Sequence, residues 1–160
     1  MVRCIVIPRD GNGTPRIQEL DGIRDFQKVT GGWLEPIDLP ALAVTIWVNE
    51  ASERDRSRFN SRATALWWFY STRMHRQRFI LGDVVLTGDD NGEVGAEVPD
   101  DIIQGMLTPH EFVIQVSLEG DELWRNTPVC FDNIFDAIQW CMLVASTVRP
   151  GPGFRITSTV

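Results

Sequence analysis

The chain has 160 residues, 43% of them hydrophobic, and carries a net charge of −7. Six Trp and eight Phe supply large apolar side chains, so the composition predicts a folded globular protein and excludes intrinsic disorder. No apolar run approaches the roughly 20 residues of a membrane helix, and the first residues lack the apolar stretch and cleavage site of a signal peptide. We therefore expect a protein of the cytosol.

The first third of the chain is typical of strands around one short helix. A β-branched run opens the chain and is closed by Pro8, and the polar, glycine-containing stretch after it predicts the turn of a hairpin. Asp21 can cap a helix through Val29, which the Gly31-Gly32 pair ends because glycine tolerates positive φ. The expected elements are strands over residues 3–7 and 16–20, the helix after Asp21, and strands over residues 33–39 and 41–49.

The middle of the chain predicts one long helix followed by a strand. Apolar residues recur at three- and four-residue spacings from Ala63 to Tyr70, and Met74 continues the stripe, so this helix should bury one face against a sheet. Asn60 or Ser61 can cap its start. The elements expected here are a helix over residues 61–76, a strand over residues 79–88 and one helical turn over residues 99–105.

Thr108-Pro109 marks the boundary of a C-terminal unit with its own pattern. Residues 111–118 alternate as a strand, and a second strand leads to Asp132, which can cap an apolar helix. The sequence RPGPG stops that helix, and the last residues return as a strand. About fifty residues are few for an independent core, so we expect this unit to pack on the first part of the chain.

Together these elements predict an α+β protein. A mixed or antiparallel sheet with two main helices should occupy residues 1–107. A small ββαβ unit, packed against it, should occupy residues 110–160.

Charge is distributed unevenly along the chain. Residues 53–78 contain seven Arg and two acids, whereas no Lys or Arg occurs between Phe79 and Trp124, where eleven acids accumulate. An acidic face formed by residues 83–122 disfavours phosphate backbones and favours a basic partner, although the same charges also serve solubility alone. The candidate partner-binding residues are Asp89, Asp90, Glu93, Asp100 and Asp101.

Arginines and tryptophans lie close together between residues 54 and 68. Guanidinium groups bind phosphates in a bidentate manner and an adjacent aromatic ring can stack a base, which indicates anion recognition. The alternative is that Arg54, Arg56 and Arg58 are solvated or pair with the acids of the same chain. The negative net charge makes duplex nucleic acid the least favoured ligand. The candidate ligand-binding residues are Trp33, Arg58, Asn60, Arg62 and Trp67.

Motifs of known chemistry are missing from the sequence. There is no phosphate loop, dinucleotide fingerprint, zinc spacing or nucleophile elbow. His75 and His110 are distant in the chain, and the three cysteines, Cys4, Cys130 and Cys141, lack paired spacing and are expected to be buried thiols. We therefore expect a protein that is not an enzyme and has no metal or cofactor.

Several separated motifs, taken in chain order, resemble a bacteriophage and conjugative-element family of unknown function. The motifs are Gly-Gly followed by aromatic-x-Glu, then Asn-Glu, Asn-x-x-Ala-Thr and Gly-x-Val-x-x-x-Gly, over about residues 1–105. Their positions here are Gly31, Gly32, Trp33, Glu35, Asn49, Glu50, Asn60, Arg62, Ala63, Thr64, Gly82 and Gly88. Family members have a short stretch with Gly and Leu-Pro where this chain has ASERDRSRF, so the arginines depart from the family pattern.

This resemblance implies a mobile-element context and no known catalytic residues. One hypothesis is an accessory protein of a phage, a counter-defence or host-takeover factor in the host cytosol whose acidic face engages a basic host protein. The alternative hypothesis is a protein that sequesters a small nucleotide-like anion through the Arg-rich loop. Neither hypothesis fixes the oligomeric state.

Overall fold

The computed structural model describes residues 1–50, 58–71, 78–118, 122–147 and 153–158. The chain divides into two compact units, Met1–Gln104 and Gly105–Val160. The helix α3, Asp100–Leu107, spans this division, which the sequence had placed between residues 107 and 110. Both units combine antiparallel sheets with helices, so the predicted α+β class is confirmed. None of the helices in these described ranges is long and apolar enough to cross a bilayer.

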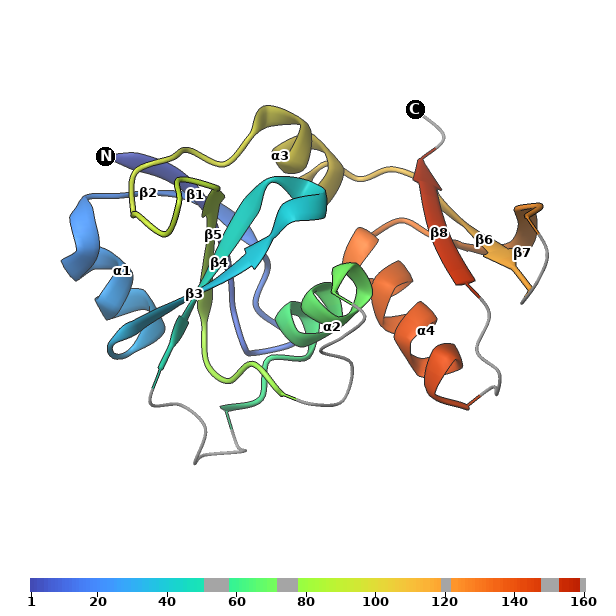
Figure 1. Cartoon of the computed structure of the whole chain (residues 1–160), viewed down its shortest axis with the longest axis horizontal. Helices are drawn as coiled ribbons and strands as arrows, with labels where there is room; N and C mark the ends of the chain where they lie inside the picture. The colour runs from blue at the N-terminus through green and yellow to red at the C-terminus, as the bar shows by residue number, and fades with distance from the viewer. Residues whose placement is uncertain (51–57, 72–77, 119–121, 148–152, 159–160) are drawn as a thin grey trace. The chain divides into compact units, whose positions relative to one another are not determined.

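The first unit is built on a five-stranded sheet in the order β2-β1-β5-β4-β3, shown in Figure 1. Every strand pair in it is antiparallel, which settles the choice between a mixed and an antiparallel sheet. The central strands β4 and β5 are buried along their whole length. Their burial is therefore continuous, without the alternation of buried and exposed residues that is typical of a half-buried strand. The strands are β1 (Val2–Ile7), β2 (Arg16–Leu20), β3 (Leu34–Leu39), β4 (Val44–Asn49) and β5 (Val84–Gly88).

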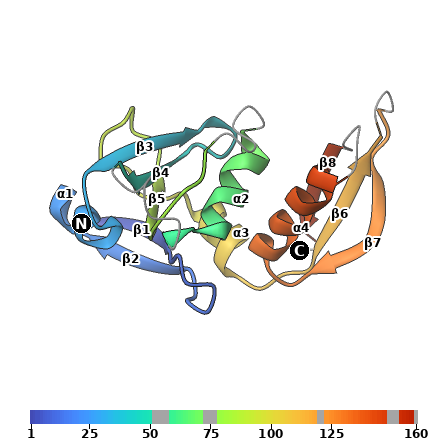
Figure 2. The ribbon, with the colours of Figure 1, turned by 90° about the horizontal axis from the view of Figure 1, so that it is seen from below.

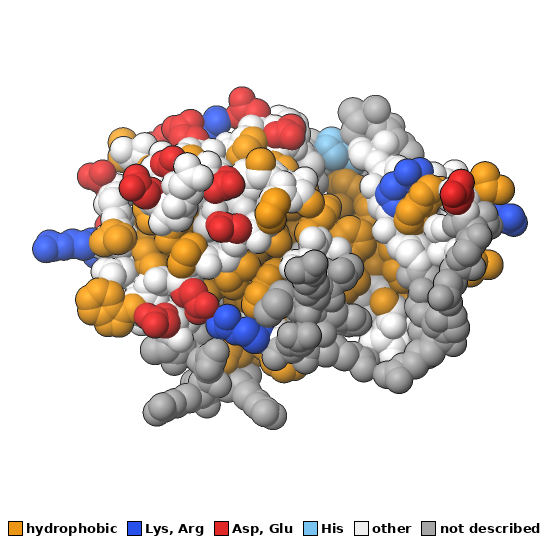
Figure 3. All heavy atoms as spheres, viewed as in Figure 1, with side chains coloured by type: hydrophobic (Ala, Val, Ile, Leu, Met, Phe, Trp, Pro, Cys, Tyr) orange, Lys and Arg blue, Asp and Glu red, His pale blue; other side chains and the backbone are white. Residues whose placement is uncertain are grey.

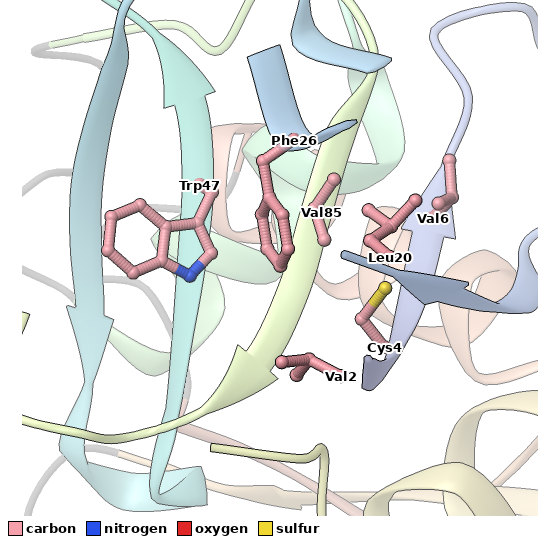
Figure 4. Close-up of a cluster of buried hydrophobic side chains, with 7 residues drawn as sticks. All are labelled: Val2, Cys4, Val6, Leu20, Phe26, Trp47 and Val85. Carbon is pink, nitrogen blue, oxygen red and sulfur yellow. The ribbon is translucent and has the colours of Figure 1, made fainter. Parts of the chain in front are cut away.

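Helix α1, Gly22–Thr30, covers one face of this sheet. Its Phe26 is fully buried and meets Trp47 of β4 edge to face, with 6.3 Å between ring centroids. Figure 4 shows Phe26 pointing from the helix onto the sheet between Trp47 and Val85. Burying such a ring stabilises the fold by about 1.5–3 kcal/mol, so this contact anchors the helix. The rest of the cluster consists of Val2, Cys4, Val6 and Leu20.

Helix α2, Ser61–Tyr70, lies on the other side of the sheet from α1, as Figures 1 and 2 show. Asn60 caps its start, and residues 63–67 are buried. The sequence predicted a longer helix, to Arg76, but α2 ends at Tyr70; Met74 lies outside the described residues. Of the predicted strand over residues 79–88, only β5 is regular, preceded by a single bridge between Phe59 and Leu81.

The second unit is a ββαβ arrangement whose sheet has the order β7-β6-β8. Helix α4 buries Phe135, Ala137, Ile138 and Cys141. Asn133, rather than Asp132, caps the helix, because the Asn133 side chain accepts a 2.8 Å hydrogen bond from the Phe135 amide. The elements are β6 (Phe112–Ser117), β7 (Arg125–Phe131), α4 (Ile134–Thr147) and β8 (Gly153–Ser158).

Candidate functional site

The guanidinium of Arg58 lies against two glycines that come from distant parts of the first unit. Gly31 ends α1, and Gly82 precedes β5. A Cβ atom added to Gly31 would lie 3.1 Å from Arg58 Nη2, and one added to Gly82 would lie 3.3 Å from the same atom. The two glycines thus form a cradle of backbone around the arginine head group, which we call the Arg58 cradle.

Two separate constraints require glycine at both positions of the cradle. Gly31 has φ of 86° and Gly82 has φ of 80°, in the left-handed region that other residues rarely adopt. A side chain at either position would also press on the guanidinium. The next residue, Gly32, makes room for a second side chain, because a Cβ there would lie 2.6 Å from Asn49 Oδ1. Asn49 is only 6% exposed, and its Nδ2 would lie 3.8 Å from a Cβ on Gly31.

Arg58 is half-buried, and no acid in the described parts of the chain forms an ion pair with its head group. Among the residues that the structure describes, no hydrogen bond or ion pair involves its guanidinium. A partly desolvated charge without a counter-charge is costly, which favours the binding of an anion. The C-terminal end of α1 offsets part of this cost, since a cation is stabilised there by the helix dipole.

Asn60 and Arg62 are held by the backbone of the first unit. Fully buried Asn60 donates through Nδ2 to the carbonyls of Ile7 and Gly82, at 3.0 and 2.9 Å, and accepts at 3.0 Å from the Ala63 amide. This uses one side chain to join β1, the segment before β5 and the start of α2.

Arg62 anchors the loop between β1 and β2. Its guanidinium donates to the carbonyls of Pro8, Asp10 and Gly13 at 2.6 to 2.8 Å. Although the sequence offered Asn60 and Arg62 as ligand-binding residues, the structure gives their polar atoms these backbone partners.

The two candidate tryptophans lie in different environments. Trp67 is 5% exposed, and the Arg78 guanidinium lies 5.8 Å from its ring centroid. Arg78 in turn forms a bidentate ion pair with Glu35, at 3.1 and 3.2 Å. Trp33, directly after the glycine pair, is 73% exposed. Of the candidate ligand-binding residues, therefore, Asn60 and Trp67 are buried, Arg58 and Arg62 are half-buried, and Trp33 is exposed.

Aromatic side chains also gather around Phe59, the residue that follows Arg58. Phe59 and Phe79 meet at 5.9 Å between centroids, and Trp68 of α2 meets Phe79 at 5.4 Å. Arg54 and Arg56 lie outside the described residues.

The five candidate partner-binding acids lie between the end of β5 and the first turn of α3. Asp89, Glu93 and Asp101 are exposed, and Asp90 is half-buried. Asp100 is bound to Arg3 at 2.7 Å, with Glu97 at 3.7 Å from the same guanidinium. Asp89 also accepts a hydrogen bond from the Asn91 amide in a turn. Figure 3 shows carboxylates gathered over the first unit with few basic side chains among them.

Groups with the chemistry of a nucleophile or metal ligand do not form a reactive centre. Burial raises the pKa of Cys4 to about 11 and that of Cys141 to about 12, which keeps both thiols protonated. Cys130 is exposed, which corrects the expectation of three buried thiols, and lines an open hollow with His110 and Asp132. Across the described residues, no group of three or more metal-ligating side chains is placed to hold an ion.

Sequence reasoning missed the partners of Arg58. Gly31, Gly82 and Asn49 were identified as motif residues, but only the folded chain shows that Gly31 and Gly82 lie against the same guanidinium and that Asn49 lies against the glycine pair. A glycine that follows a helix predicts a helix end, and nothing local in the sequence predicts which side chain will lie on it. The Glu35–Arg78 pair was missed for the same reason, since the two residues are 43 positions apart.

Comparison with known proteins gives a family for the first unit. Residues 2–111 match the model of a family described as a domain of unknown function, DUF3846. The matched range is close to residues 1–105, over which the sequence motifs predicted a family resemblance. No curated protein and no solved structure matches the chain. A phage or conjugative-element origin and the five motifs stay predictions. Because the match covers more than half of its residues, the chain belongs to the DUF3846 family of unknown function.

Proposed function

We propose that the first unit is a binding domain that takes a small, nucleotide-like anion at the Arg58 cradle. The observation that supports this proposal is the half-buried guanidinium held between Gly31 and Gly82, with no counter-charge among the described residues. A phosphate or carboxylate group would supply the missing charge and accept two parallel hydrogen bonds from the guanidinium fork.

The surroundings of the cradle favour a small ligand over a polymer. Trp33, one residue beyond the glycine pair, offers an exposed indole on which a base can stack. A pocket needs only two or three convergent polar groups to hold such a ligand. A nucleic-acid duplex would instead meet the net charge of −7, which weakens binding to a phosphate backbone.

Thermal unfolding with a panel of ligands tests the proposal. The panel contains inorganic phosphate, citrate, adenine nucleotides and cyclic nucleotides, so it separates a phosphate site from a carboxylate site. A ligand at a hundred times its Kd should stabilise the folded state by about 2.7 kcal/mol, which raises the Tm by several degrees. Arg58→Ala should abolish the shift and Arg58→Lys should reduce it, because lysine keeps the charge and loses the fork.

The matched control is Arg24→Ala, which removes the same charge from an exposed position on α1. It should leave the ligand-induced shift unchanged. Arg58→Ala also removes the favourable charge at the end of α1, so its Tm without ligand is measured first and the shift is taken from that value. The proposal is wrong if no ligand raises the Tm, or if the shift survives Arg58→Ala.

A second candidate function rests on the exposed carboxylates of Asp89, Glu93 and Asp101. In this case the acidic face binds a basic protein of the host, and the chain acts as a counter-defence or host-takeover factor of a mobile element. Long-range attraction between opposite charges would speed association and make it sensitive to salt.

A pull-down from a host lysate at rising salt tests this second candidate. The triple variant Asp89→Asn, Glu93→Gln and Asp101→Asn should lose a basic partner that the native protein retains at low salt. The control triple variant Glu19→Gln, Asp21→Asn and Glu50→Gln changes three exposed acids elsewhere on the first unit by the same amount. A partner that is recovered equally at low and high salt would contradict a role for this face. An equal loss of the partner in both triple variants would contradict it as well.

A further inference from the structure

The four edge strands of the two sheets differ in how they are protected against pairing with another chain. An exposed edge presents unpaired N–H and C=O groups, and natural proteins blunt it with charges, prolines or bulges. Strand β2 carries exposed Arg16 and Glu19, and β3 carries Pro36. Strand β7 carries Pro128, and its register with β6 is irregular.

Strand β8 has none of these protections. It pairs with β6 in an unbroken register along all six residues, from Gly153 opposite Ser117 to Ser158 opposite Phe112. Its other side pairs with no strand in the described parts of the chain. The strand contains no proline and no acid, and its single charge is Arg155.

The charge of Arg155 is directed away from the free edge. Its Nε donates at 2.8 Å to Gln115 Oε1 on the neighbouring strand β6, and its guanidinium lies 4.8 Å from the centroid of the Trp124 ring. These contacts hold the side chain over the interior of the sheet. A lysine or arginine guards an edge only when its charge meets the incoming strand, so β8 remains open to pairing.

We propose that β8 pairs in antiparallel fashion with β8 of a second copy of this chain. A free edge of this kind is complementary to itself, because an antiparallel copy presents the same donors and acceptors in reverse order. A two-fold axis at Ile156 places Arg155 opposite Thr157 of the second copy. The two arginines then do not lie directly opposite each other, which avoids repulsion between like charges. The two three-stranded sheets then join into one of six strands.

The same axis decides where the helices lie. Phe154 meets Trp140 of α4, with 6.0 Å between centroids, so the even-numbered residues of β8 face the helix and the odd-numbered ones face away. Opposite residues in an antiparallel pair share a face. Ile156 therefore meets Ile156 of the second copy on the helix side, and both copies of α4 cover the same face of the joined sheet.

The mass of the full chain in solution, measured by light scattering over a concentration series, tests this pairing. The native protein should pass from the mass of one chain to that of two as concentration rises. Thr157→Lys places a second cation opposite Arg155 and should weaken the dimer roughly twofold to thirtyfold, because each of the two symmetric cross-strand contacts changes sign. Thr157→Val keeps a β-branched, uncharged residue at the edge and should dimerise as the native chain does.

Amide hydrogen exchange provides a second measurement on the same samples. Amides of β8 should become more protected as concentration rises, whereas those of the guarded edge strand β7 should not change. A chain that stays monomeric throughout the series overturns the proposal. So does a dimer that Thr157→Lys leaves intact, or one that forms without added protection in β8.

Discussion

The two units of this protein have cores of different composition. Every buried polar side chain among the described residues belongs to the first unit, where Asn49, Asn60 and four threonines are buried. The core of the second unit contains only apolar side chains and a thiol, including Phe112, Ile114 and Phe135. Apolar burial alone suffices for a small sheet and helix, whereas the longer chain of the first unit also uses polar contacts to select one arrangement.

The polar contacts of the first unit connect segments that are distant in the sequence. Asn60 joins β1, the segment before β5 and the start of α2, and Trp47 donates at 2.9 Å to Thr87 between β4 and β5. A buried polar group is costly when it loses its partner, so a misplaced strand or helix would leave several such groups unsatisfied. The comparison therefore predicts that the two units respond to different kinds of mutation.

The largest effect is expected from a cavity in the second unit. Phe135→Ala removes a ring that is 2% exposed and should lower the free energy of unfolding of that unit by about 3–5 kcal/mol. Leu143→Ala, on the same helix but 64% exposed, is the control and should cost about 0.5 kcal/mol or less. Urea denaturation followed by circular dichroism measures both variants. An equal loss of stability in the two variants would mean that Phe135 does not contribute to the packing of α4.

A polar change should affect the first unit in a comparable way. Asn60→Ala leaves the Ile7 and Gly82 carbonyls and the Ala63 amide without their partner, and should cost about 3 kcal/mol. Asn12→Ala, in an exposed turn, should change stability by about 0.5 kcal/mol at most. Chemical denaturation compares the two variants. If Asn60→Ala were as mild as its control, the buried polar contacts would not specify this unit.

Glycine-to-alanine substitutions should lower the stability of the protein in the Arg58 cradle and raise it in α3. Gly82→Ala forces a Cβ into positive φ and against the Arg58 guanidinium, and should destabilise by about 1–2 kcal/mol. Gly105→Ala lies in α3, where a Cβ meets nothing within 4 Å, and should stabilise by about 0.5–1 kcal/mol. Thermal unfolding shows the two signs directly. A neutral Gly82→Ala variant would contradict the close packing of the cradle.

A further prediction concerns the thiols, one buried in each unit. The folded state raises the pKa of Cys4 to about 11 and of Cys141 to about 12, whereas an unfolded thiol ionises near 9. Their contribution to stability is therefore complete below pH 9 and is lost as the pH rises toward the folded values. Urea midpoints should fall between pH 8 and pH 11, and a thiol reagent at pH 8 should modify only exposed Cys130 in the native protein. Rapid modification of all three thiols would contradict this burial.

Local sequence patterns predicted most of the elements but not their ends or their polar partners. Turn residues located the opening hairpin, the Asp21 cap and the Gly31-Gly32 end located α1, and apolar patterning located the C-terminal ββαβ order, because each signal depends on neighbours in the chain. The pattern extended α2 beyond Tyr70, since an apolar stripe does not show where packing stops. Asn60 was correctly predicted as a cap, but its bonds to Ile7 and Gly82 depend on long-range folding.

The candidate site shows the same limit. The sequence singled out Arg58 by its local density of charge, and it grouped Arg58 with Arg62 because the two are close in the chain. The structure separates them: Arg62 binds three carbonyls of the loop after β1, whereas Arg58 lies on glycines from two other segments. Charge density identifies candidate arginines, and only the fold decides which of them bonds to the backbone and which lies against glycines.

The side-chain 15N signal of Arg58 provides the most direct test of the cradle as a binding site. In a titration of the full chain with phosphate and with adenosine monophosphate, we expect the Nε–Hε signal of Arg58 to shift and saturate together with the amide signals of Gly31 and Gly82. The corresponding signals of Arg62 and Arg24 should not move. An Arg58 signal that stays in place at millimolar ligand, or that moves no more than that of exposed Arg24, would contradict anion binding at this site.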